Sequence, residues 1–123
     1  MRRMIELGLQ NIQRGLCGGL DGCAPATPEE FEMPPVTIAQ ARIAVLVGTQ
    51  SALARWCGLD AERRSVAPML RQIRQKMKFN ERQVALMAVI HGIQLGLVSE
   101  ELKARGDCNE ATRRQLDAEL PKN

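Results

Sequence analysis

The stretch from Val84 to Val98 constrains the fold of this chain more than any other part of the sequence. Its only polar side chains are His91 and Gln94, so a helix formed here would have no fully hydrated face along its middle. A run of this length, at about 1.5 Å per residue, covers about 22 Å and falls short of the roughly 30 Å hydrocarbon core of a bilayer. The sequence therefore predicts the central buried helix of a protein core.

This central helix is expected to span residues 80–104, because Asn80 can cap its first turn and Gln83 can reach back in a capping box. At about 100° per residue its surface divides into three stripes, one large and apolar, one small, and one mixed. We expect the large stripe to be core and the small stripe to form a tight helix crossing, since each glycine in a helix interior costs about 1 kcal/mol relative to alanine. In order, the stripes are Leu86, Ile90, Ile93 and Leu97; Ala85, Ala88, Gly92, Gly96 and Ser99; and Met87, His91, Gln94 and Val98.

Aromatic residues make up only 2% of the chain, namely Phe31, Trp56 and Phe79. A core of aliphatic residues, without alternating β-branched and aromatic positions, is typical of helices rather than sheets. The length fits one domain. We therefore predict an all-α fold, an antiparallel bundle of about five helices around the helix at 80–104, with short connections after Thr37.

The first helix is expected within residues 1–15, where Ile5, Leu9, Ile12 and the following Leu16 recur at helical spacing. Residues 16–36 are rich in glycine and proline and are predicted to be a linker that holds one short helix capped by Thr27. This linker leaves open whether the first helix docks on its own chain or on a second copy.

The bundle itself is expected to occupy residues 37–120. Thr37, with Gln40 at the third helical position, begins a long helix that Gly58 ends. A shorter helix runs from after Asp60 to about Lys78, with Pro68 placed in a first turn. The last helix is capped by Asp107 or Asn109 and stops before Pro121.

We predict no enzyme activity, because the sequence lacks the common nucleophile, zinc-protease, phosphate-loop and paired-carboxylate motifs. His91 is the only histidine and is interpreted as a structural residue. Cys17 and Cys23 do not have the spacing of a zinc site. No catalytic residue, metal or cofactor is therefore expected.

Cys57 ends one predicted helix and Cys108 opens another, so these two residues are a candidate disulfide. Two alternatives stay open: a pair of small buried side chains, and a reactive thiol at Cys108, where a helix N-terminus would lower its pKa.

A basic ridge, defined as Arg64, Arg71, Arg74 and Lys78, is predicted along one side of the helix after Asp60. Such a ridge can contact phosphates or acidic proteins, although a solvated helix face would look the same. The net charge of +3 permits an acidic partner without requiring one. Trp56 is either a plug at the end of the bundle or an anchor for a partner.

These features favour a non-catalytic protein–protein interaction module, a small regulator, adaptor or anti-activator that forms homodimers and binds another protein through a helix face. The candidate partner-binding residues are Ile5, Leu9, Ile12, Trp56 and the basic ridge. Nucleic-acid binding by the basic ridge is the alternative, and a disulfide-stabilised envelope or thiol-redox protein is the next; no membrane association is expected. The N-terminus lacks the apolar run of a signal peptide, so a cytoplasmic location is the default, with a periplasmic or secreted location as the alternative because the cysteine count is even.

Overall fold

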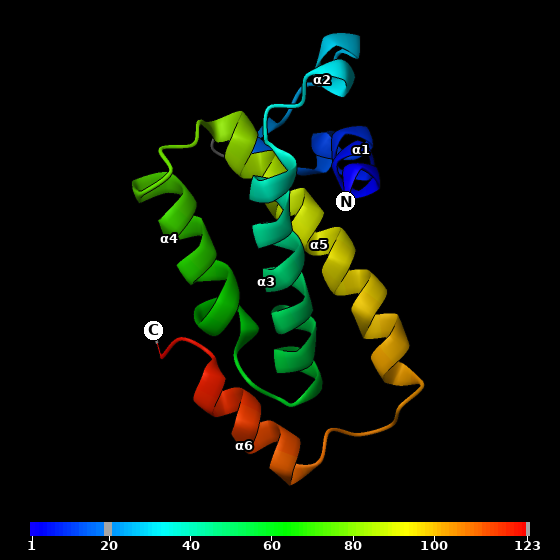
Figure 1. Cartoon of the computed structure of the whole chain (residues 1–123), viewed down its shortest axis with the longest axis vertical. Helices are drawn as coiled ribbons and strands as arrows, with labels where there is room; N and C mark the ends of the chain where they lie inside the picture. The colour runs from blue at the N-terminus through cyan, green and yellow to red at the C-terminus, as the bar shows by residue number, and fades with distance from the viewer. Residues whose placement is uncertain (19–20, 123) are drawn as a thin grey trace.

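The computed structural model describes residues 1–18 and 21–122, and helices make up most of it (Figure 1). Within these residues the only strands are two short ones that pair antiparallel, so the prediction of an all-α fold is confirmed. A 3₁₀ turn follows the first helix, and a π-helical turn leads directly into the fourth. The elements are α1 Arg2–Gln10, the 3₁₀ turn Ile12–Arg14, β1 Leu16–Gly18, β2 Asp21–Gly22, α2 Pro28–Glu32, α3 Ile38–Trp56, the π-helix Glu62–Val66, α4 Ala67–Gln75, α5 Glu81–Lys103 and α6 Glu110–Glu119.

Capping boxes begin three of the helices, as predicted. Thr27, Thr37 and Asn80 each accept a hydrogen bond from the backbone N–H three residues later. In each case the side chain at that third position reaches back to the N–H of the cap. Because these bonds satisfy N–H groups that the helix itself leaves unpaired, the starts of α2, α3 and α5 are fixed locally.

The most extensive helix contact joins α3 to α5. The two helices approach closely at Gly48, where an added Cβ would lie 2.8 Å from the carbonyl oxygen of His91. They run in the same direction, whereas α4 runs opposite to both (Figure 1). Hydrogen bonds agree with this direction, because Gln83 bonds to Pro35 before α3 and Trp56 bonds to Gly106 after α5. The largest interface therefore lies between parallel helices, whereas antiparallel neighbours were predicted. Helix α4 carries the chain from the end of α3 back toward the start of α5.

Helix α1 packs on the first half of α5 of its own chain. An added Cβ at Gly8 would lie 2.7 Å from Ile90 and 2.9 Å from Leu86, so the two helices touch with no space for a side chain there. This contact closes the main core, which also contains residues from α3 and α4. Its buried members include Ile5, Leu9, Ile12, Val36, Ala41, Ala44, Met69, Ile73, Val84, Leu86, Met87 and Ile90.

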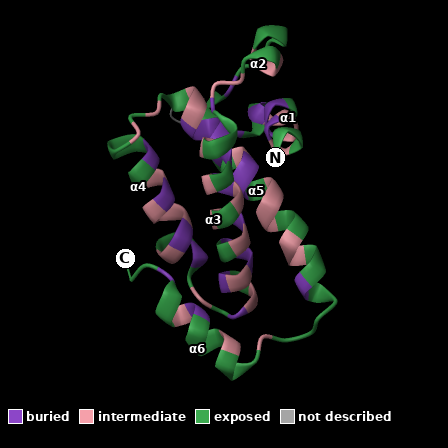
Figure 2. Ribbon diagram, in the orientation of Figure 1, coloured by how far each residue is buried: buried purple, intermediate pink, exposed green. Residues whose placement is uncertain are grey.

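The second half of α5 departs from the predicted burial. Leu97 is 53% exposed, although its stripe was expected to be core, and only the earlier Leu86 and Ile90 are fully buried. The predicted tight crossing at Gly92 and Gly96 is wrong, because an added Cβ at either position would meet no atom within 4 Å. Figure 2 shows the consequence, with burial concentrated in the half of α5 that lies beneath α1 and α3.

Of the helices in the described part of the chain, α5 alone has the length and composition to cross a membrane. Its most apolar window has a mean hydropathy of 1.3, and 33% of that window is buried. A core helix of a soluble protein passes the same test, so this property alone assigns no location.

Helix α6 covers a second, smaller core at the far end of α3. Its Leu116 and the following Leu120 pack with Ala54, Cys57 and Ala61. Gly58, which adopts a φ of 74°, turns the chain beside this core at the end of α3, as predicted. Asn109, one of the two predicted caps, begins α6 by accepting from the N–H of Thr112.

Candidate functional site

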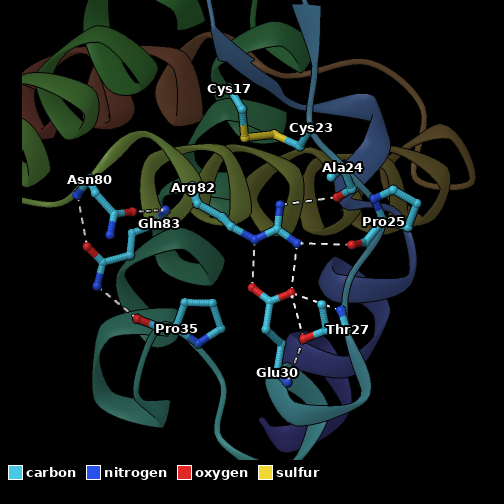
Figure 3. Close-up of polar contacts among 10 residues, drawn as sticks. All are labelled: Cys17, Cys23, Ala24, Pro25, Thr27, Glu30, Pro35, Asn80, Arg82 and Gln83. Atoms are coloured by element: carbon cyan, nitrogen blue, oxygen red, sulfur yellow. Dashed lines mark hydrogen bonds and ion pairs between the residues drawn. A yellow bond between two sulfur atoms is a disulfide. The ribbon is translucent and has the colours of Figure 1, made fainter.

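The segment 16–36, predicted to be a linker, is held against the body of the protein by Arg82. This side chain, in the first turn of α5, forms two hydrogen bonds to the Glu30 carboxylate, at 2.6 and 2.7 Å (Figure 3). It also donates to the backbone oxygens of Ala24 and Pro25, at 3.1 and 3.3 Å. Arg82 therefore anchors the segment between Ala24 and Glu30. Gly19 and Leu20 of the predicted linker lie outside the described residues.

Glu30 has two roles in this anchor. It binds Arg82, and it accepts the N–H of Thr27 as the third residue of the α2 capping box. The hydrogen bonds from Arg82 lower the pKa of Glu30 from 4.5 to about 2, against the opposing effect of burial and with further help from Thr27. The hydrogen bonds to Glu30 in turn raise the pKa of Arg82. One ionised carboxylate thus both starts α2 and attaches it to α5.

A disulfide between Cys17 and Cys23 makes the beginning of this segment compact. Cys23 is buried in the main core, and its N–H donates to the Gly15 oxygen at 3.1 Å. Cys17 lies within β1, and Cys23 directly follows β2. The disulfide therefore closes a short loop at the start of the segment that connects α1 to α2.

A cleft of about 290 Å³ opens between α1, the end of α2 and the start of α3. Ile5 and Val36 form its buried floor, whereas Met33 and Ile38 on its rim are 83% and 42% exposed. Met33 stands outside because α2 ends there, immediately before a proline that cannot continue the helix. The full lining is Arg2, Ile5, Glu32, Met33, Pro34, Val36, Thr37 and Ile38.

Two opposite charges flank this apolar cleft. Arg2 belongs to α1 and Glu32 ends α2, and both are exposed. Neither takes part in an ion pair within residues 1–18 and 21–122. The cleft thus offers apolar surface together with one cation and one anion that are free to contact another molecule.

A buried hydrogen-bonded chain joins α3, α5 and the π-helix. Ser65 donates to the carbonyl oxygen of Ala61 at 2.8 Å, so its only proton is used. It therefore accepts from Ser51 at 2.6 Å, and Ser51 in turn accepts from Nε2–H of His91 at 2.7 Å. In this arrangement the hydroxyl proton of Ser51 points away from His91, opposite to what a serine nucleophile activated by histidine requires.

Burial of this chain favours a structural role. Ser51 is fully buried, and His91 is nearly so. Burial lowers the pKa of His91, and Arg55 adds to that effect while Glu62 opposes it. A neutral His91 that donates to Ser51 links α5 to α3 through a buried hydrogen bond.

The basic ridge is divided in the structure. Arg64 bonds to the Asp117 carboxylate at 2.6 Å and to the backbone oxygens of Asp117, Leu120 and Pro121, so it anchors α6. This contact lowers the pKa of Asp117. Arg71, Arg74 and Lys78 remain exposed. Three of the four residues of the basic ridge therefore remain available to a nucleic acid or an acidic protein.

Cys57 and Cys108 form a disulfide that connects the end of α3 to the segment before α6. Trp56, half-buried beside it, packs with the second core and donates to the oxygen of Gly106 at 2.7 Å. Arg113 of α6 donates to the oxygen of Cys57 at 3.0 Å. Trp56 thus lies where a plug at the end of the bundle would lie.

The candidate partner residues of α1 and the 3₁₀ turn after it lie inside the protein. Ile5, Leu9 and Ile12 are buried against their own chain, and of the three only Ile5 also contributes to the cleft. Sequence reasoning did not identify Met33 or Ile38. A signal for Met33 was present, because an apolar residue directly before Pro34 and Pro35 ends a helix and cannot be sheltered by its next turn.

Comparisons of the chain with protein-family models, with curated proteins and with solved structures find no match.

Proposed function

We propose that this protein is a non-catalytic protein–protein interaction module, a small regulator, adaptor or anti-activator, and that its partner binds at the cleft between α1, α2 and α3. The observation that supports this proposal is the exposure of Met33 and Ile38 on the rim of an apolar cleft. Methionine is over-used at protein-binding surfaces because its side chain is flexible and polarisable.

The rigidity of the cleft supports the same proposal. Capping boxes fix the starts of α2 and α3, and the Arg82–Glu30 contact attaches α2 to α5. Gln83 also donates to the oxygen of Pro35 at 2.9 Å, which holds the connection between α2 and α3. A surface ordered before binding loses little conformational entropy when a partner arrives, so its affinity is higher for the same contact area.

We further propose that the protein works in an oxidising compartment, which favours the periplasmic or secreted alternative over the cytoplasm. Two disulfides in a chain of 123 residues support this proposal, because cytosolic reductants keep thiols reduced.

The experiment that tests the interaction is affinity capture from the native host with three versions of the oxidised protein: wild type, Met33→Asp and Leu46→Asp. Leu46 is the matched control, since it is a 66% exposed apolar residue on α3 outside the cleft. We expect a protein retained by the wild type and by Leu46→Asp to be lost with Met33→Asp. If both variants capture that protein equally well, the proposal is contradicted.

A further inference from the structure

The proposed function leaves the partner at the cleft unspecified, and the charges around the cleft restrict its chemistry. A partner that covers Met33 and Ile38 and also pairs both charges would supply an acid for Arg2 and a base for Glu32. These are the groups that the cleft itself carries. Under two-fold symmetry, residue i of one chain meets residue j of the other and j meets i. The cleft is therefore complementary to itself.

We infer that the molecule bound at this cleft is a second copy of the same chain, with Met33 of each copy covering the apolar floor of the other and Arg2 of each copy facing Glu32 of the other. This inference rests on the proposed function, because it names the partner of the same surface.

The geometry of Met33 fits this contact. Its side chain projects from the end of α2, and 83% of it is exposed. The cleft beside it, with a volume of about 290 Å³, has room for an unbranched side chain. Transfer of two methionines from water into apolar clefts provides a driving force, and the two charge contacts fix the register of the copies.

This dimer differs from an exchange of α1 between copies. Here α1 stays on its own α5, where Gly8 fits closely against Leu86 and Ile90. Apart from the buried floor residues Ile5 and Val36, the symmetric contact uses residues that a folded single chain already exposes, namely Arg2, Glu32, Met33 and Ile38. It therefore forms and separates without unfolding either copy.

Sedimentation equilibrium of the oxidised full chain at about 1 to 100 µM tests the inference. We expect a mass that approaches twice the 13.6 kDa of one chain as concentration rises. Met33→Asp should weaken association at least tenfold, since a buried methionine side chain contributes about that factor or more. Leu46→Asp should leave it unchanged. Circular dichroism of each variant checks that it is folded.

Charge reversal gives a second and more specific test. Arg2→Glu alone and Glu32→Arg alone should each weaken self-association, because each homodimer would bring like charges together twice. A mixture of the two variants should associate as the wild type does, since both contacts then join opposite charges. If the mixture associates with wild-type affinity, the two-fold contact is supported. If the mixture associates as weakly as each variant alone, the two-fold contact is overturned.

Two further outcomes separate the inference from the proposed function. If the wild type stays monomeric at 100 µM, the inference is overturned. It is also overturned if the Met33→Asp variant dimerises as well as the wild type does. The proposed function survives that result if Met33→Asp still loses a different protein that wild type and Leu46→Asp capture from the host.

Discussion

Exchanging two glycines for alanine, one at a time, tests how α5 is packed. Gly48 lies where α3 meets α5, and an added Cβ would be 2.8 Å from both the His91 oxygen and the Cβ of Gln94. Neither atom can rotate away, because one is backbone and the other is attached to it. Gly92 is the control, since it lies inside α5 with nothing within 4 Å of an added Cβ.

The expected free-energy changes have opposite signs. Alanine in place of glycine stabilises a helix interior by about 1 kcal/mol, so Gly92→Ala should raise the free energy of unfolding by about that amount. At Gly48 the same gain is opposed by overpacking, which costs about 1 to 3 kcal/mol. Because the helices would also be pushed apart at the Ser51–His91 hydrogen bond, we expect Gly48→Ala to lower stability by about 1 kcal/mol or more.

Chemical denaturation of the oxidised protein, followed by far-ultraviolet circular dichroism, measures both changes. The midpoint should shift in opposite directions for the two variants, while the slope stays that of the wild type. If Gly48→Ala is as stable as the wild type, or Gly92→Ala is less stable by more than about half a kcal/mol, the assignment of the α3–α5 contact is wrong.

The remaining predictions concern the core, the anchor and the second disulfide. Ile90→Ala, at a fully buried position, should cost about 2 to 5 kcal/mol in the same denaturation experiment, and a loss below about half a kcal/mol would contradict the core assignment. Because the folded-state pKa of Glu30 is depressed to about 2, the stability that Arg82 contributes is present above about pH 4.5 and is lost as the pH falls toward 2. Arg82→Gln should therefore destabilise near neutral pH by on the order of 2 kcal/mol and approach the wild type near pH 2, whereas a difference independent of pH would argue against this ion pair. Replacing both Cys57 and Cys108 with alanine should cost about 4 kcal/mol, as the chain-entropy model gives for a separation of 51 residues, and an unchanged denaturation midpoint would mean that the two cysteines are not joined in the purified protein.

Helix starts were predictable because their determinants are local. Thr27, Thr37 and Asn80 are each satisfied by a residue three positions later, so a short window of sequence contains the whole interaction. The placement of Pro68 in a first turn holds only in part, since α4 begins at Ala67 but the π-helix Glu62–Val66 runs directly into it.

Burial along α5 was not predictable, because it depends on segments far away in the sequence. Gly8, Gly48, Gly92 and Gly96 all lie inside predicted helices, but only the first two are covered by another helix. Periodicity identifies which residues share a face and does not identify what covers that face. The second half of α5 is as apolar as a core helix, although α1 packs only on the first half.

The candidate site shows the same limit. Its floor residue Ile5 was singled out as a contact residue from its helical spacing. The Arg82–Glu30 pair, separated by 52 residues, had no local signature, because a single arginine and a single glutamate are common on helix surfaces. Only the fold brings these two residues together and turns a glycine- and proline-rich segment into a rigid wall of the cleft.

The partners of Arg82 and Arg64 are far apart in the sequence, and this separation determines when each contact can form during synthesis. The contact of Glu30 cannot form until Arg82, 52 residues later, has been synthesised. The contact of Arg64 likewise requires Asp117, 53 residues later. Chains emerge from the ribosome from the N-terminus at about 5 to 20 residues per second. The apolar face of α1 therefore leaves the ribosome several seconds before Leu86 and Ile90 of α5, against which it packs in the folded protein.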